Sequence, residues 1–131
     1  MGKANGSVAR SDALVLFGVT GDLAHKMIFP ALYAMAKRGA LRVPVIGVAS
    51  SKWSLEHLRK RVMDSLKRSG GIDDQRVLKH LLSLLRYVAG DYNDRYTFTA
   101  IKKELGSARR PAHYLAIPPS LFATVIQGLG V

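Results

Sequence analysis

The sequence predicts an α/β fold with a mostly parallel, doubly wound sheet of the Rossmann-like type. Short apolar runs alternate along the chain with longer amphipathic segments, which is the pattern of successive βαβ units. The first apolar run, residues 13–17, ends at the turn Gly18-Val19-Thr20-Gly21. Ligands of parallel sheets bind beyond the carboxyl ends of the strands, so this turn marks the candidate site.

Four strands are expected, each short and rich in apolar residues. They span residues 13–17, 43–49, 86–90 and 112–117, and each is followed by Gly, Ser, Asp or Pro. Because helical segments separate all four, we expect parallel strands with helices on both faces of the sheet.

Five helices are expected at residues 22–38, 54–69, 73–85, 95–105 and 120–127. Ser54 and Ser120 are expected as N-caps, and Asp22 is expected in the first turn of its helix. Pro30 lies inside the first helical segment, so the sequence predicts a kink or break near Phe29.

Length and composition indicate a single globular domain. The chain has 131 residues, of which 48% are hydrophobic and 22% are charged. Residues 1–11 are polar and are predicted to form a disordered arm, and residues 12–131 are predicted to form the dinucleotide-binding domain. The chain is short for an enzyme with a second substrate and ends without a clear helix cap. We therefore expect a coenzyme domain without a substrate domain.

The formal net charge of +11 favours polyanionic partners such as phosphorylated cofactors, sugar phosphates or nucleic acid. The cations mostly punctuate amphipathic helices, as at residues 58–62, so no nucleic-acid partner is expected. The absence of cysteine excludes disulfides and thiolate metal sites, and no metal-ligand spacing appears. No apolar run is long enough for a membrane span, and a cytoplasmic protein is expected.

The spacing Gly-x-x-Gly-x-x-Ala at residues 18–24 predicts that a pyrophosphate meets the N-terminus of the following helix. Gly18 permits the tight turn, Gly21 lets backbone N–H groups approach phosphate oxygens, and Ala24 allows close packing of helix on strand. A purely structural turn is the alternative interpretation. A P-loop is disfavoured because no Gly-Lys-Ser/Thr sequence follows.

The end of the second strand indicates which dinucleotide binds. NAD-specific folds place an Asp or Glu there, on the 2′-hydroxyl of the adenosine ribose. This chain has Ser50, Ser51 and Lys52 instead. Two hydroxyls and an ammonium suit a 2′-phosphate, so NADP is the predicted cofactor. The alternative is a solvent-exposed turn with a helix cap.

Five motifs of the chain resemble those of one enzyme family. They are Phe17-Gly18-Val19-Thr20-Gly21-Asp22-Leu23-Ala24, Phe29-Pro30, Ile46-Gly47-Val48-Ala49-Ser50, Gly90-Asp91-Tyr92 and Tyr114-Leu115-Ala116-Ile117-Pro118-Pro119. Over residues 12–130 the chain resembles the N-terminal coenzyme domain of the glucose-6-phosphate dehydrogenase family. The resemblance implies an NADP site formed by Gly18, Val19, Thr20, Gly21, Asp22, Leu23, Ala24, Ser50, Ser51, Lys52, Asp91, Tyr92, Ile117 and Pro118.

The chain departs from the family pattern at several points. Many members carry an arginine where this chain has Ser50, and a lysine where it has Met27. The Glu-Lys-Pro and Arg-Ile-Asp-His-Tyr-Leu-Gly-Lys-Glu segments, which in the family hold the sugar phosphate and supply the catalytic histidine, do not occur in the 131 residues. Further strands complete the sheet in the family, so the resemblance also implies that the sheet of this chain is incomplete at its C-terminal end and that the substrate domain is absent. The histidines present, none with an evident carboxylate partner, are His25, His57, His80 and His113. We expect His25 at the surface and assign no catalytic residue.

The leading hypothesis is that the chain is the coenzyme-binding part of a glucose-6-phosphate dehydrogenase. The resemblance implies oxidation of glucose 6-phosphate to 6-phosphogluconolactone with NADP+, in the oxidative pentose phosphate pathway, by a complete enzyme that is a homo-oligomer. The chain by itself is expected to bind NADP without turnover. The alternatives are a non-catalytic nucleotide-binding module or a truncated product, and a nucleic-acid-binding domain that rests on charge alone.

Overall fold

The computed structural model describes residues 11–130, and the predicted arm lies, apart from Ser11, outside the described residues. One sheet has the strand order β3-β2-β1-β4, formed by β1 (Ala13–Phe17), β2 (Val45–Ala49), β3 (Leu85–Ala89) and β4 (Pro111–Leu115). All three pairs of neighbouring strands are parallel. The predicted parallel sheet is therefore confirmed, and its first strand lies between the second and the fourth.

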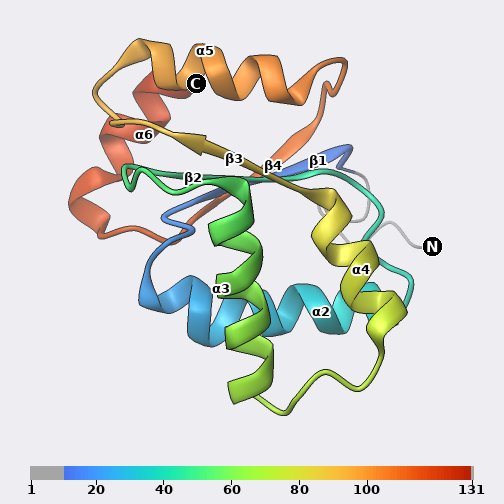
Figure 1. Cartoon of the computed structure of the whole chain (residues 1–131). Helices are drawn as coiled ribbons and strands as arrows, with labels where there is room; N and C mark the ends of the chain where they lie inside the picture. The colour runs from blue at the N-terminus through green and yellow to red at the C-terminus, as the bar shows by residue number, and fades with distance from the viewer. Residues whose placement is uncertain (1–10, 131) are drawn as a thin grey trace.

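Helices cover both faces of the sheet, as Figure 1 shows. One face carries α2 (Phe29–Lys37), α3 (Leu55–Arg68) and α4 (Gln75–Leu84). The other face carries α5 (Arg95–Leu105) and α6 (Phe122–Leu129). This arrangement confirms the predicted doubly wound fold.

Side chains of the two central strands alternate between two cores. Leu16 of β1 and Val45 of β2 pack on the face of α2, α3 and α4. Val15 and Ile46, which are partners in the parallel register, pack on the face of α5 and α6. Because both faces are buried, the two strands consist almost entirely of apolar residues rather than alternating with polar ones.

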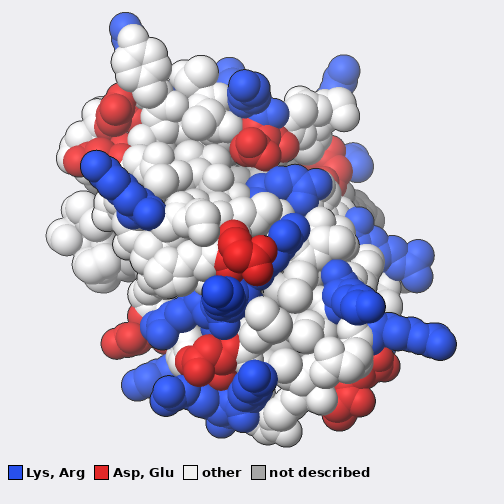
Figure 2. Space-filling model, viewed as in Figure 1, with Lys and Arg blue, Asp and Glu red and all other residues white. Residues whose placement is uncertain are grey.

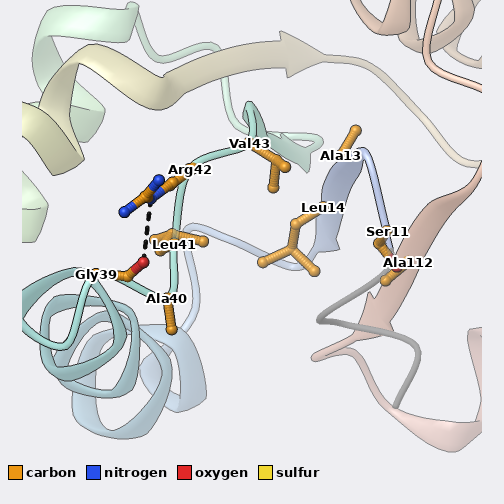
Figure 3. Close-up of a pocket in the computed structure, with 9 residues that line it drawn as sticks. All are labelled: Ser11, Ala13, Leu14, Gly39, Ala40, Leu41, Arg42, Val43 and Ala112. Carbon is orange, nitrogen blue, oxygen red and sulfur yellow. Dashed lines mark hydrogen bonds between the residues drawn. The ribbon is translucent and has the colours of Figure 1, made fainter. Parts of the chain in front are cut away.

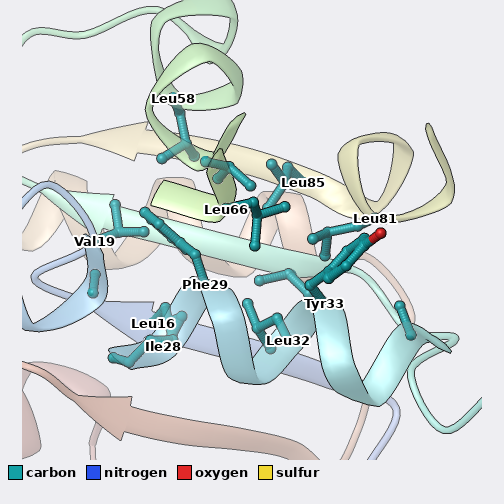
Figure 4. Close-up of a cluster of buried hydrophobic side chains, with 14 of the residues drawn as sticks. Leu16, Val19, Ile28, Phe29, Leu32, Tyr33, Leu58, Leu66, Leu81 and Leu85 are labelled. Carbon is teal, nitrogen blue, oxygen red and sulfur yellow. The ribbon is translucent and has the colours of Figure 1, made fainter. Parts of the chain in front are cut away.

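The larger core lies between the sheet and the helices α2, α3 and α4 (Figure 4). Phe29, Leu58 and Leu81 contribute one almost fully buried side chain from each of these helices. Burial of each such side chain stabilises the fold by about 1.5–3 kcal/mol. The same packing fixes α3 beside the turn that follows β1, which matters for the site.

The predicted irregularity near Phe29 is a π-helical turn, η2 (Ala24–Ile28), which precedes α2. The Phe29 N–H donates to the Ala24 carbonyl, five residues earlier. Pro30 has no N–H and therefore cannot make the α-helical bond to the carbonyl of residue 26. The wider π-helical turn accommodates this missing hydrogen bond without interrupting the helix.

The predicted N-cap at Ser120 is wrong. Ser120 lies inside a 3₁₀ turn, η3 (Pro119–Leu121), and α6 begins only at Phe122 with no side-chain cap. The Leu121 N–H donates to the Pro118 carbonyl at 2.9 Å, so the two prolines fix a tight turn before the helix starts. The predicted N-cap at Ser54 is confirmed, because the Ser54 hydroxyl accepts from the His57 N–H at 3.0 Å.

β4 is one of the two edge strands of the sheet within the described chain, the other being β3, and it is less buried than β1 and β2. Tyr114 on this strand is 49% exposed. Phe122 and Ile126 on the neighbouring α6 are 36% and 42% exposed. This is the end of the sheet at which the sequence predicts incompleteness.

Gly47 of β2 lies directly under the side chain of Val19, and a methyl group at Gly47 would lie 2.8 Å from a Val19 methyl. Gly47→Ala is expected to lower the free energy of unfolding by about 1–3 kcal/mol through overpacking. Val19→Ala removes the obstructing methyls, so the double variant should lose less stability than the two single variants summed. Urea unfolding followed by circular dichroism measures this, and additive effects would contradict the contact.

Candidate functional site

The turn after β1 is held between the ends of two strands by Gly18. Its N–H donates to the Val48 carbonyl at 2.8 Å and to the Tyr92 hydroxyl oxygen at 3.0 Å. Its φ is +82°, and a Cβ would lie 2.1 Å from the Ala116 carbonyl oxygen. The protein's own backbone therefore requires glycine here, as the sequence predicts for a tight turn.

Gly21 stands in a different environment. Its N–H donates to the Gly18 carbonyl at 3.1 Å, and the residue is exposed. It has no positive φ, and a Cβ would touch only the Gly18 carbonyl oxygen, at 3.4 Å. No contact within the described chain therefore requires a glycine at this position.

The remaining residues of the predicted turn divide between core and surface. The side chains of Val19 and Ala24 are 1% and 0% exposed and face the core, so a ligand in the turn meets their backbone only. Asp22 is exposed, and Leu23 is 47% exposed. Ala24 is packed in the larger core, in agreement with the predicted close contact between the helix and the strand.

The end of β2 meets the glycine turn through two hydroxyl groups. Thr20 Oγ1 lies 3.1 Å from Ser51 Oγ, so these two predicted site residues are brought together across the sheet edge. Ser50 and Lys52 are exposed beside them. The Tyr87 hydroxyl donates to the Ser51 carbonyl, and burial raises the pKa of Tyr87 to about 12, which keeps this donor protonated.

Tyr92 lies in the loop that follows β3, and its side chain contacts the glycine turn. Its hydroxyl accepts from Gly18, and its ring meets Phe17 edge to face, with centroids 5.8 Å apart. Burial raises the pKa of Tyr92 above its ordinary value. Neighbouring Asp91 accepts from the Asn93 N–H at 2.8 Å and thereby shapes its own loop. Tyr92 thus supports the turn, a role that the sequence pattern did not reveal.

Ile117 and Pro118 follow β4 on the opposite side of the turn. A Cβ at Gly18 would lie 2.8 Å from the Ile117 side chain, so Ile117 flanks the turn directly. Pro118 is exposed and precedes η3. The structure therefore gathers the predicted site residues from all four strands at one edge of the sheet.

His25 differs from the expectation of a surface histidine without an acidic partner. Its side chain is 12% exposed, and Nε2 lies 2.8 Å from Asp64 Oδ2 of α3. The Ser65 hydroxyl also donates to the His25 carbonyl. The sequence reasoning missed this pair because its members are 39 residues apart and only the packing of η2 on α3 joins them.

The other histidines have no acidic partner in the described residues. His57 stacks on Trp53, with ring centroids 4.1 Å apart and planes 17° from parallel. His80 Nε2 lies 2.8 Å from the Leu41 carbonyl oxygen, and the His113 ring faces Phe17. Among residues 11–130 no group of three or more His, Cys, Asp or Glu side chains gathers as a metal would require.

Basic side chains are interspersed with acidic ones on the face shown in Figure 2. Several cations are paired, as Lys37 is with Asp73 at 2.6 Å and Arg59 with Glu56 at 3.8 Å. This distribution matches the expected solvated helix faces. In the part of the chain that the structure describes, no helix has the length and apolar character needed to cross a bilayer.

A cavity of about 330 Å³ lies at the other end of β1 from the glycine turn (Figure 3). It is lined by the start of β1 and the loop before β2, where the Arg42 Nε donates to the Gly39 carbonyl at 3.2 Å. None of the predicted coenzyme residues lines it. The candidate site is therefore the open carboxyl edge of the sheet and not this cavity.

The strand order and the glycine turn at the carboxyl end of the first strand define a Rossmann-like domain of the dinucleotide-binding class. The family model "Glucose-6-phosphate dehydrogenase, NAD binding domain" matches residues 15–131. The chain belongs to the glucose-6-phosphate dehydrogenase family.

Individual relatives agree with this assignment. A glucose-6-phosphate 1-dehydrogenase from Mycobacterium bovis is 42% identical over 125 residues, which cover 95% of this chain and 27% of the relative. The crystal structure of the Mycobacterium avium enzyme superposes with a TM-score of 0.87 at 42% identity, over 92% of this chain and 26% of that one. The structure of a glucose-6-phosphate dehydrogenase in complex with glucose 6-phosphate superposes with a TM-score of 0.79 at 34% identity. The match covers 91% of this chain and 27% of that one. The chain thus spans about a quarter of the length of these relatives.

The His25–Asp64 pair makes the stability of the fold dependent on pH. The hydrogen bond from His25, followed by that from Arg68, lowers the pKa of Asp64 below 3.8. The pair's contribution is therefore complete above the unfolded pKa and is lost as the pH falls through the lower folded pKa. In denaturant unfolding from about pH 6 to about pH 2.5, Asp64→Asn should be less stable than the wild type at the upper end, and the difference should shrink on acidification. A difference independent of pH would contradict this assignment.

Gly18→Ala is expected to lower the free energy of unfolding by about 2–4 kcal/mol. The backbone at this position is left-handed, which disfavours alanine, and the added methyl would clash with the Ala116 carbonyl oxygen. Thermal unfolding followed by circular dichroism measures the loss. Gly21→Ala is the matched control and should change stability by less than about 1 kcal/mol. Equal losses in the two variants would overturn the distinction drawn between these glycines.

Proposed function

We propose that this chain binds NADP+ at the carboxyl edge of its sheet. It serves as the coenzyme-binding part of an enzyme that oxidises glucose 6-phosphate to 6-phosphogluconolactone. As expected from the sequence, the proposed setting is a cytoplasmic homo-oligomer.

Gly21 is the observation that carries the proposal. The fold itself accounts for glycine at Gly18, whereas at the exposed Gly21 a Cβ would make only an ordinary contact with the Gly18 carbonyl oxygen, at 3.4 Å. A glycine that the protein does not need for its own packing is explained by a ligand that must approach the backbone. At the start of a helix that follows a parallel strand, the ligand that fits is a pyrophosphate.

The surrounding residues suit the rest of the coenzyme. The linked hydroxyls of Thr20 and Ser51, with exposed Lys52 beside them, offer donors and positive charge to an adenosine 2′-phosphate. No acid stands at the end of β2 to bind a ribose 2′-hydroxyl. These features favour NADP+ over NAD+.

When bound, NADP+ supplies the nicotinamide that accepts a hydride. The residues of this chain hold and orient it: Gly18 and Gly21 shape the phosphate turn, and Tyr92 keeps that turn against β2 and β3. His25 is engaged by Asp64 on the flank of α3, and we assign it to holding η2 in place. The sugar-phosphate and histidine segments of the family do not occur in the 131 residues, so we expect these residues by themselves to bind the coenzyme without turnover.

The binding site is tested with Gly21→Ala, in which the added methyl occupies the approach to the backbone. The full-length protein should bind NADP+ more tightly than NAD+ in isothermal titration, and the variant should bind NADP+ at least about tenfold more weakly at nearly unchanged thermal stability. Trp53, the single tryptophan of the 131 residues, follows Lys52 directly, so its fluorescence in this chain reports binding at this edge.

Absence of binding of either dinucleotide to the wild-type protein would overturn the proposed function. Equal affinity for NADP+ and NAD+ would overturn the proposed preference. Reduction of NADP+ in the presence of glucose 6-phosphate, measured on the full-length protein, separates the proposed enzyme from a non-catalytic nucleotide-binding module, which would bind but not reduce.

A further inference from the structure

We propose that Arg61 of α3 recognises the 2′-phosphate of NADP+ and sets the preference over NAD+. This inference rests on the proposed coenzyme site and names a residue within it. The end of β2 carries Ser50 and no arginine, so a guanidinium for this phosphate has to come from another element.

The packing of α3 beside the glycine turn brings Arg61 to the proposed site. Its Nη2 lies 3.9 Å from Asp22 Oδ1, and Asp22 directly follows Gly21. One residue before Gly21, Thr20 is linked to Ser51 at the end of β2. The guanidinium thus reaches the same turn that carries the proposed phosphate contacts, although its Cα lies 40 positions along the chain from Gly21.

The hydrogen-bonding state of Arg61 leaves it able to take an anion. The side chain is only 30% exposed, and among the described residues its buried Nε has no hydrogen-bond partner. Its acidic partner in the described chain, Asp22, is 88% exposed, and the 3.9 Å between them is near the outer limit for an ion pair. Such exposed pairs contribute little to stability. A doubly charged phosphate is a stronger partner for the planar fork of an arginine, which can hold it with two hydrogen bonds.

Arg61 also offsets the one acid of the turn. An exposed carboxylate beside a dinucleotide favours a ribose hydroxyl and repels a 2′-phosphate. Asp22 is such a carboxylate, and the positive charge of Arg61, 3.9 Å away on the side of α3, opposes its negative potential. Loss of Arg61 would therefore remove an attraction and expose a repulsion, both of which act on the phosphate.

Arg59 provides a matched control on the same helix. It is 34% exposed, its Nε is also buried without a partner in the described chain, and its acidic neighbour Glu56 lies at 3.8 Å. Arg59 lines a hollow with residues of α4, among them Lys79, and not the glycine turn. The two arginines thus have the same charge and similar burial and pairing. They differ in what they face, which is the glycine turn for Arg61 and α4 for Arg59.

The experiment compares two ligands that differ only by the 2′-phosphate, adenosine 2′,5′-bisphosphate and 5′-AMP. Affinities are measured by Trp53 fluorescence and isothermal titration on the full-length protein, for the wild type, Arg61→Gln, Arg61→Lys and Arg59→Gln. In Arg61→Gln, binding of the bisphosphate should weaken about tenfold or more and binding of 5′-AMP less than about twofold. Arg61→Lys should lose part of the discrimination, and Arg59→Gln should keep it.

An unchanged ratio of the two affinities in Arg61→Gln overturns the inference and leaves the proposed function intact. Equal weakening of both ligands, or the same loss of discrimination in Arg59→Gln, also overturns it, because a structural role or the overall charge would then be the cause. Thermal unfolding of each variant verifies folding, and Arg61→Lys provides the readout if Arg61→Gln does not fold. A wild-type protein that binds neither ligand would instead refute the proposed function.

Discussion

The close approach of backbone to backbone at Gly18 is the constraint on which the candidate site depends. The ends of β1, β2 and β4 converge there, and the Gly18 N–H is shared between the Val48 carbonyl and the Tyr92 hydroxyl. Any side chain would force Ala116 away and open the sheet edge. Because the turn is fixed by the strands themselves, the neighbouring Gly21 is left exposed, as the proposed phosphate contact requires.

Helix α3 is the second support of this edge, and it acts through charge. Asp64 pairs with His25 on the π-helical turn, while Arg61 reaches Asp22 at the start of the same helical segment. Arg68 also contacts Asp64, at 3.2 Å. One helix thus presents alternating charges to the segment that follows the glycine turn. The Arg61–Asp22 pair, with Asp22 88% exposed, is weak, so we expect it to matter more for the proposed ligand than for stability.

Most of the fold was predictable because it rests on local patterns. Apolar runs bounded by Gly, Ser, Asp or Pro predicted all four strands, and the helices expected at residues 54–69 and 95–105 match α3 and α5 to within one residue at each end. The misplaced start of α6 has a local cause, since Pro118 and Pro119 favour a 3₁₀ turn that outweighs the capping preference of Ser120. The missed partner of His25 has a non-local cause, because Asp64 belongs to another helix.

The sequence by itself determined the order of the elements, the parallel sheet and the strand ends at which the coenzyme site is proposed. These follow from hydrophobic periodicity and turn chemistry, which act over a few residues. Only the tertiary structure decided which of those residues meet: Thr20 with Ser51, Tyr92 with Gly18, and Arg61 with Asp22. Such contacts join residues 31 or more positions apart, and they depend on how helices pack over a twisted sheet, which no local pattern encodes.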